Sequence, residues 1–315
     1  TLKFSSLMVL ESWILLSFCS ALFLGFYDAV KKSSVSKNSA LATLFWATTT
    51  GGLICSGLLA LREFAPLTFR PWGGDWEDLS LKQHGYIAVK AVIVSSSWTF
   101  SFIALKNLPL SIVAPIRASG PVWTLMLAVF IFSEQLSLPQ GLAFMLSLGC
   151  YVWFSYLGKR DGLTLWKNPW VLCILLGTWI GAISGVYDKW LIQVQQLHPV
   201  AIQLYFSVYM VVFQALLFGL IRCIKKENTP FEWRWSIPLV AVFLLIADAF
   251  YFKALQREEA MVGLVSAMRR GSLLVSFAIS YWWFKEPQAK TKAWPVLGVA
   301  IGLAWLAWSS HNANA

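Results

Sequence analysis

The chain has 315 residues, of which 58% are hydrophobic and only 13% are charged. Because soluble domains carry about 25% charged residues, this composition excludes a soluble enzyme, a disordered chain and a disulfide-stabilised scaffold. We therefore predict an all-α integral membrane protein that crosses the bilayer many times. The formal net charge is +10, which we attribute to basic residues in cytoplasmic connections rather than to nucleic-acid binding.

A helix that crosses a hydrocarbon core of about 30 Å needs about 20 largely apolar residues. Ten such segments follow one another along the chain, separated by charged residues or by Pro and Gly. They cover residues 8–30, 38–61, 84–106, 108–132, 138–157, 169–192, 198–221, 236–256, 260–284 and 292–309. The longest connection is 62–83, and no stretch has room for an extramembrane domain. Residues 1–7 precede Met8, a natural start, and we interpret them as a remnant of cloning.

Short patterns recur in the same order in the two halves of the chain. Residues Gly25–Asp28, at the end of the first span, match Gly185–Asp188 at the end of the sixth, with an offset of 160 residues. Arg117 in the fourth span and Arg269 in the ninth lie 152 residues apart. The long connection 62–83 in the first half accounts for the smaller second offset.

Each half contains five spans, and an odd number requires the second half to insert upside down relative to the first. We therefore predict two inverted five-helix repeats, residues 8–157 and 169–309. Inverted repeats are an architecture of secondary transporters, with the substrate site at the repeat interface. Glu134 and Glu286 occupy equivalent positions and so lie on opposite membrane faces. We interpret both as caps of the following helix rather than as an acid/base pair.

The fourth and ninth spans begin with Leu108–Pro115 and Ala260–Val265, and each ends in a polar break, Phe132–Ser137 and Phe284–Glu286. The fifth span of each half is rich in small residues, including Gly141, Gly149, Gly298 and Gly302. With these features the chain resembles the drug/metabolite transporter superfamily, and within it the ten-helix EamA-type members. The resemblance implies a basket of helices around a central cavity, no enzymatic activity, and transport of metabolites or drugs.

The basic residues in the connections predict an orientation. Connections after spans one, three, five, seven and nine hold 14 Lys and Arg, whereas the opposite side holds 5. The positive-inside rule therefore places both ends of the chain outside the cell. The resemblance implies the reverse, with cytoplasmic ends, and the sequence leaves both orientations open. We expect the protein in the cytoplasmic membrane of a bacterium.

Some charged residues fall inside the predicted spans, where each costs at least about 2.5–3.5 kcal/mol at the bilayer centre. Such groups usually face a cavity and pair with or bind something. The basic ones are Lys90, Arg117, Lys189, Lys253, Arg269 and Arg270, and the acidic ones are Asp28, Asp188 and Asp248.

Arg117 and Arg269 lie about 13 Å into their spans, near mid-membrane. One hypothesis is that they bind a carboxylate or phosphate of the substrate across the repeat interface. The alternative is that each pairs with an Asp and braces the bundle. Arg270 is also a candidate, although it points about 100° away from Arg269 on a helix. Asp248 is equally deep, and we expect it to carry a proton, recognise an amine, or pair with an arginine.

Asp28 and Asp188 lie near span ends, each directly after a tyrosine, Tyr27 or Tyr187. We interpret the two acids as gates or proton carriers, with plain helix-end charges as the alternative, and the tyrosines as candidate substrate contacts. The lysines at 90, 189 and 253 are close enough to span ends for their ammonium groups to snorkel to the interface.

Trp98 follows three serines inside the third span, so it is a candidate to stack on a substrate. The five Cys are scattered and the three His lie at segment ends, so we expect neither a metal nor a cofactor. The sequence thus predicts a secondary transporter for a small carboxylate- or phosphate-bearing metabolite, with the bilayer and a small-molecule substrate as its partners and a proton as a candidate coupling ion. A flippase for a lipid-linked head group and an intramembrane enzyme are the alternatives.

Overall fold

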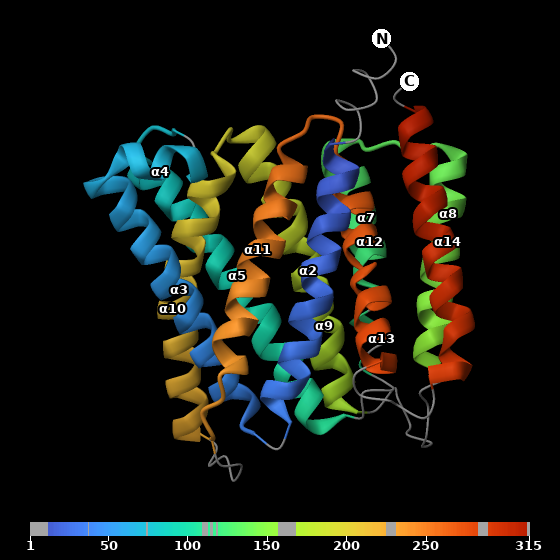
Figure 1. Cartoon of the computed structure of the whole chain (residues 1–315), viewed down its shortest axis with the longest axis horizontal. Coiled ribbons are helices and arrows are strands. Elements are labelled where there is room, and N and C mark those ends of the chain that lie inside the picture. Colours follow the sequence, from blue (N-terminus) through green and yellow to red (C-terminus); the bar gives the residue numbers. More distant parts are fainter. Residues whose placement is uncertain are drawn as a thin grey trace.

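The computed structural model describes residues 12–36, 38–73, 75–108, 113, 116–117, 119–156, 168–224, 231–282 and 289–313. All the regular structure in this part of the chain is helical (Figure 1). The elements are α2 (Ser12–Val35), α3 (Ala40–Phe64), α4 (Pro66–Gly73), α5 (Leu81–Asn107), α7 (Gly120–Phe132), α8 (Leu138–Tyr156), α9 (Pro169–Lys189), the π-helical turn η2 (Trp190–Val194), α10 (Pro199–Ile224), α11 (Ser236–Leu255), α12 (Val262–Arg269), α13 (Ser272–Trp282) and α14 (Ala289–Ala313). The interpretation of residues 1–7 lies outside the described residues.

Within this part of the chain, seven helical segments are long and apolar enough to cross a membrane. They are Trp13–Val35, Leu41–Phe64, Pro169–Val194, Pro199–Arg222, Ser236–Leu255, Val262–Ile279 and Ala293–His311. Two shorter apolar helices, Gly120–Phe132 and Leu138–Phe154, run beside them. The remaining predicted span, 84–106, corresponds to α5, which is long but carries Lys82, Lys90 and a run of serines. The prediction of an all-α membrane fold is confirmed.

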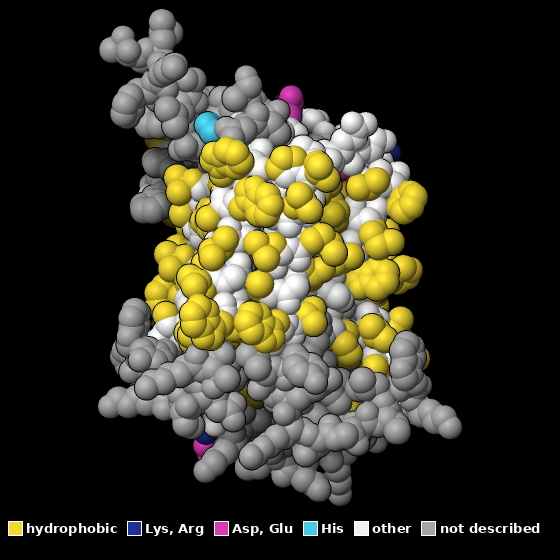
Figure 2. Space-filling view, turned by 90° about the vertical axis from the view of Figure 1, so that its right-hand side faces the viewer, with side chains coloured by type: hydrophobic (Ala, Val, Ile, Leu, Met, Phe, Trp, Pro, Cys, Tyr) yellow, Lys and Arg dark blue, Asp and Glu magenta, His cyan; other side chains and the backbone are white. Residues whose placement is uncertain are grey.

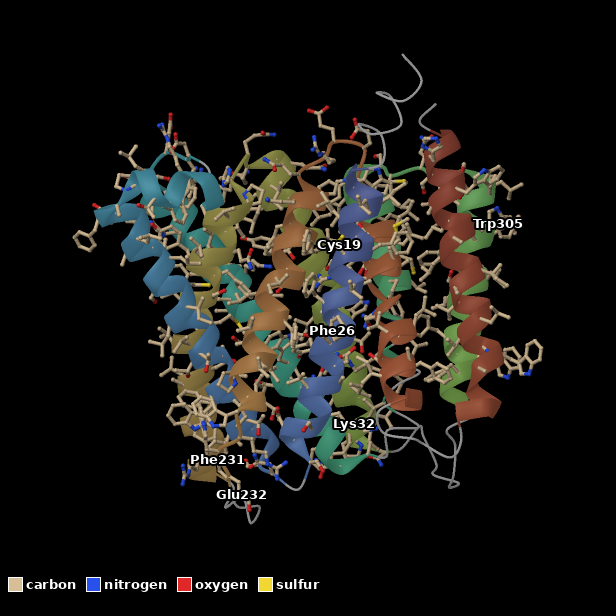
Figure 3. All side chains as sticks on the ribbon, viewed as in Figure 1. Cys19, Phe26, Lys32, Phe231, Glu232 and Trp305 are labelled. Carbon is tan, nitrogen blue, oxygen red and sulfur yellow. The ribbon has the colours of Figure 1, made fainter. Side chains whose placement is uncertain are left out.

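Successive long helices alternate in direction, so the connections lie on two opposite faces (Figure 1). We call the face where α2 begins and α14 ends the Ser12 face, and the opposite one the Val35 face. The labelled residues Cys19, Phe26 and Lys32 follow α2 from the first face toward the second, where Phe231 and Glu232 also lie (Figure 3). Because α2 begins at the Ser12 face and α9 at the Val35 face, the second half runs in the opposite sense to the first.

The outer surface between these faces is apolar. Figure 2 shows a broad band of hydrophobic side chains around the middle of the molecule, on the side where α8 and α14 lie. On these two helices Leu142, Met145, Leu297, Ile301 and Trp308 are all exposed. A monomeric soluble protein rarely exposes such a continuous apolar surface, whereas lipid-facing helices do so normally.

The two halves interdigitate rather than forming separate bundles. Helix α2 of the first half packs against α11, α12 and α13 of the second, α3 packs against α10, and α5 packs against α9. Helices α8 and α14 pair with each other at one side of the molecule (Figure 1). Most helices of either half therefore contact helices of the other, and the space between them is a common interface.

The fourth and ninth spans are interrupted, whereas the sequence predicted continuous helices at 108–132 and 260–284. Turns at Ser119 and at Arg270–Gly271 separate α7 and α13 from the chain before them. Ser119 and Gly271 are 152 residues apart, the offset of the two arginines. At Gly271 a Cβ would lie only 2.9 Å from the carbonyl oxygen of Met268, so the turn favours glycine. Both halves thus bring a helix start to mid-membrane.

The connection 62–83 also contains a helix that the sequence did not predict, α4. It begins at Pro66, whose fixed φ suits a first helical turn. Arg62 at the end of α3 hydrogen-bonds Asp78 at 2.8 Å and closes the connection. Ser80 and Gln83 then form a capping box that starts α5.

Candidate functional site

A cavity of about 360 Å³ lies between the two halves. Its wall includes residues of α2, α3, α5, α7, α9, α10, α11, α12 and α13, together with Arg270 of the second mid-membrane turn. Nearly all the site residues predicted from the sequence line this one cavity: Tyr27, Asp28, Trp98, Arg117, Asp188, Asp248, Arg269 and Arg270. The volume falls within the range of small-molecule sites.

The cavity wall is strongly charged for a membrane interior. Among the described residues that line it, five are basic and three are acidic, an excess of two positive charges. The basic ones are Lys31, Lys90, Arg117, Arg269 and Arg270, and the acidic ones are Asp28, Asp188 and Asp248. Because buried charges require partners, the pairing of these groups decides what the cavity can bind.

Arg269 and Asp248 form an ion pair on the cavity wall. Nη2 of Arg269 lies 2.7 Å from Oδ1 of Asp248, and the guanidinium carbon lies 4.1 Å from the ring centroid of Tyr251. Nε of Arg269 is buried and has no hydrogen-bond partner among the described residues. The alternative in which Asp248 pairs with an arginine is therefore what the structure shows.

Arg117 and Arg270 differ from Arg269, because neither has an ion pair or hydrogen bond within the described part of the chain. Both lie close enough to Asp28 for electrostatic attraction. The carboxylate of Asp28 accepts a hydrogen bond of 3.4 Å from the hydroxyl of Ser272. A Cβ on Gly120 would lie 2.9 Å from Nη2 of Arg270, so this glycine makes room for the guanidinium at the start of α7.

The structure contradicts the interpretation that Lys90 snorkels to the interface. Its side chain is buried and forms an ion pair with Asp188, and its ammonium lies 4.5 Å from the ring centroid of Phe206. The hydroxyl of Tyr251 donates a second hydrogen bond to Asp188, at 3.1 Å. Lys90 belongs to the first half and Asp188 to the second, so this pair joins the halves.

Lys189 is also buried rather than snorkelling, because its ammonium donates to Glu134 at 2.7 Å and to the carbonyl of Ala260 at 3.1 Å. Glu134 does not cap the helix that follows it. Its Oε1 instead accepts from the backbone amide of Val262, at 2.9 Å, and so caps α12. Glu286 lies outside the described residues, whereas Lys253 is exposed, as a snorkelling side chain should be.

Tyr187 does not face the cavity, although it is repeat-equivalent to Tyr27, which does. Its hydroxyl donates to the carbonyl of Tyr86 at 3.0 Å, and its ring stacks on Trp190 with centroids 5.3 Å apart. The aromatic side chain therefore packs α9 and η2 against α5. The repeat predicted equivalent positions along the chain but not equivalent surroundings.

The cavity is closed toward the Ser12 face and reaches toward the Val35 face. On the closed side, Lys90, Asp188, Glu134 and Lys189 are all less than 9% exposed. On the other side Asp28 is exposed and Lys31, near the end of α2, still lines the wall. Among the described residues, the cavity is therefore closed by buried ion pairs toward the Ser12 face and extends toward the Val35 face.

Sequence reasoning missed the closed side of the cavity and Tyr251. The partners in the two cross-half ion pairs are 98 and 55 residues apart, and neither repeat offset relates them. One available signal was depth, because a lysine inside an apolar span is costly unless it is paired. Among the described residues, no group of three His, Cys, Asp or Glu side chains is placed to hold a metal ion.

The helical bundle, its apolar exterior and the charged internal cavity define a multi-pass membrane protein with a cavity between its two halves. The sequence profile of the EamA-like transporter family matches residues 11–156. The match covers less than half of the chain, so over these residues the chain is similar to the EamA-like transporter family, a family of membrane transporters.

Structural similarity extends over the whole chain. A crystal structure of a protein that is 16% identical in sequence superposes with a TM-score of 0.72 and covers 97% of this chain and 99% of the other. At this identity the likeness shows the fold alone. Among curated proteins, none matches the chain in sequence.

Proposed function

We propose that the protein is a secondary transporter for a small anionic metabolite, a molecule that carries a carboxylate or a phosphate. The main support is that two guanidinium groups of the cavity wall, Arg117 and Arg270, have no ion pair or hydrogen bond among the described residues, although Asp28 lies close enough to attract both. Guanidinium groups bind carboxylates and phosphates through two parallel hydrogen bonds. A substrate anion would neutralise the excess positive charge of the wall.

The helix starts at the two mid-membrane turns favour the same substrate class. The first residues of α7 and α13, Gly120 and Ser272, both line the cavity. A helix start carries a partial positive charge and unpaired backbone amides, so anions are stabilised there. Trp98 on the same wall offers a ring for an apolar or aromatic part of the substrate.

We propose alternating access as the mechanism, with residues 8–157 and 169–309 as the two units that rock about the cavity. In the observed state the pairs Lys90–Asp188 and Lys189–Glu134 hold the units together near the Ser12 face. Opening toward that face requires both pairs to separate, while the Val35 face closes over the substrate. Asp28, Asp188 and Asp248 are the groups able to carry a coupling proton or to act in the gates.

The distribution of Lys and Arg supports an orientation with the Val35 face in the cytoplasm of a bacterial cell. The connections on that face hold 14 basic residues, and those on the Ser12 face hold 5. In this orientation the cavity extends toward the cytoplasm and is closed toward the outside among the described residues. Labelling of a cysteine at position 311, on the Ser12 face, with an impermeant maleimide in intact cells tests this, since only an external site reacts.

The substrate class is tested by thermal unfolding of the purified protein with a panel of amino acids, organic acids and phosphorylated metabolites. A compound that binds the folded state raises the midpoint in proportion to RT ln(1 + [L]/Kd). We expect anions to stabilise the wild type, and Arg117→Ala with Arg270→Ala to abolish that effect. Lys253→Ala is the matched control, because it removes one exposed positive charge outside the cavity.

Two results would contradict the proposal. If anions stabilise the double variant as well as the wild type, the site lies elsewhere. If only cationic or neutral compounds stabilise the wild type, the substrate class is wrong. Stabilisation by lipid-linked head groups alone, with no response to free anions, would favour a flippase.

A further inference from the structure

Tyr251 on α11 contacts two ion pairs at once. Its ring lies under the guanidinium of Arg269, 4.1 Å from ring centroid to guanidinium carbon, and that arginine pairs with Asp248. Its hydroxyl donates to Oδ2 of Asp188, which is paired through Oδ1 with Lys90. The five side chains form an unbroken series of contacts from the middle of the cavity to its closed end.

We propose that Tyr251 couples substrate binding at the central arginines to the release of the Lys90–Asp188 pair that closes the Ser12 face. This inference rests on the proposed function, because it assigns a role to Tyr251 in the response to an anionic substrate. Tyr251 is a positioning residue. Its hydroxyl stabilises the Lys90–Asp188 pair, which we call the gate, and its ring packs against Arg269 and therefore responds to a movement of that guanidinium.

The central end of this series is able to change when an anion binds. The guanidinium of Arg269 forms an ion pair with Asp248 and a cation–π contact with Tyr251. Its buried Nε has no hydrogen-bond partner among the described residues. A buried donor without a partner is unfavourable, so an incoming carboxylate or phosphate would be stabilised by accepting a hydrogen bond from this Nε–H. To donate its Nε–H to that anion the guanidinium must turn, and it then leaves the ring of Tyr251.

The gate end is sensitive to the loss of one hydrogen bond. Asp188 is 4% exposed and Lys90 is 2% exposed, so water does not replace a missing partner. Asp188 has two partners there, the ammonium of Lys90 and the hydroxyl of Tyr251. Without the guanidinium on its face, the Tyr251 side chain is free to change its χ1 rotamer and withdraw the hydroxyl. Asp188 then keeps one partner, and the pair is easier to separate.

The direction of α11 makes the coupling geometrically simple. Asp248 and Tyr251 are three residues apart on this helix, so their side chains lie on the same face, one turn apart. Phe252, the next residue, lies 5.0 Å from the ammonium of Lys90, centroid to Nζ. One rigid turn of α11 therefore contacts Arg269, Asp188 and Lys90.

The test uses spin labels on the Ser12 face, at Leu81→Cys in the first half and Glu258→Cys in the second, with the native cysteines replaced. Both positions are exposed. Distance distributions are measured with and without inorganic phosphate or succinate, and binding of each anion is measured separately by thermal unfolding. Tyr251→Phe removes only the hydroxyl, whereas Tyr251→Leu also removes the ring. Tyr187→Phe is the matched control. Tyr187 is adjacent to Asp188 in the chain, but its hydroxyl donates a hydrogen bond to the backbone carbonyl of Tyr86 instead.

We expect an anion that binds the wild type to raise the ratio of open to closed Ser12 face at least about fivefold, the lower end of measured couplings between sites. In Tyr251→Phe the ligand-free protein should already be more open, and the same anion should change the ratio less than about twofold while still binding. Tyr187→Phe should behave as the wild type does.

Three outcomes would overturn the inference. An equal anion response in Tyr251→Phe and in the wild type would show that the tyrosine couples nothing, and the transport proposal would stand. An unchanged ligand-free ratio in both Tyr251 variants would show that the hydroxyl does not hold the gate. Failure of every anion to bind the wild type would contradict the proposed substrate class itself, and the coupling with it.

Discussion

Lys189 at the end of α9 donates a hydrogen bond of 2.7 Å to Glu134, which directly precedes the connection into α8. Both side chains are buried, and they belong to opposite halves of the chain. Lys90 and Asp188 form the second buried pair between the halves. Because Asp188 and Lys189 are consecutive, the end of α9 is fixed to two elements of the first half. The π-helical turn η2 follows directly, and such turns occur often at functional sites.

Replacement of Glu134 by Gln should destabilise the protein by about 3 kcal/mol, because it leaves the ammonium of Lys189 buried without a counter-charge. Thermal unfolding in detergent measures the loss. Glu63→Gln is the control, since Glu63 is exposed and its substitution should be nearly neutral. An unchanged unfolding midpoint for Glu134→Gln would show that the pair does not hold the halves together.

Lys90→Met and Asp188→Asn should each be more harmful alone than in combination. Either single change leaves an uncompensated polar group in a buried position, whereas the double change removes both charges. A double-mutant cycle on the free energy of unfolding should give a coupling of about 1–3 kcal/mol. Strictly additive effects would mean that the two side chains do not interact in solution.

Gly120→Ala should weaken anion binding without changing the fold. The added methyl group would lie 2.9 Å from Nη2 of Arg270 and must displace the guanidinium, which is the flexible end of a long side chain. Loss of one hydrogen bond to a charged group, about 1.5 kcal/mol, corresponds to about a tenfold weaker affinity. The control is Gly57→Ala, where the new methyl group contacts nothing within 4 Å. Equal affinities of the two variants would place Arg270 outside the binding site.

The stability of the protein should fall as the pH drops below about 6.5, and His198 should contribute to that fall. Burial lowers the pKa of His198 below its ordinary value of 6.5, and the charge of Lys253 lowers the pKa further. Between the lowered pKa and 6.5, the unfolded chain binds more protons than the folded one, so acid favours unfolding. The midpoint of thermal unfolding, measured from pH 8 to pH 5, should decrease less in His198→Asn than in the wild type. A parallel decrease in both proteins would refute the assignment.

Much of the architecture is predictable from the order of residues, because the bilayer restricts the solutions. Apolar segments of about 20 residues must be helices there, since no water is available to satisfy backbone groups. Ten such segments, with Arg117 and Arg269 at matching depth, predicted the alternating helices and the cavity between the halves. The breaks at Ser119 and Gly271 were not predicted, because a turn inside an apolar run leaves the average hydropathy unchanged.

The candidate site, like the fold, was predictable from the sequence only in part. Sequence alone determined which residues are too costly to leave unpaired in a membrane, and Arg117, Asp248, Arg269 and Arg270 all reached the cavity wall. Only the tertiary structure decided which of these charges are neutralised. Arg269 pairs with Asp248 and Lys90 with Asp188, whereas Arg270 has no ion pair or hydrogen bond among the described residues. The helix crossings set these distances of a few ångströms, and no spacing along one helix encodes them. Pairing energy depends on those distances and on burial, and both arise only when the helices pack.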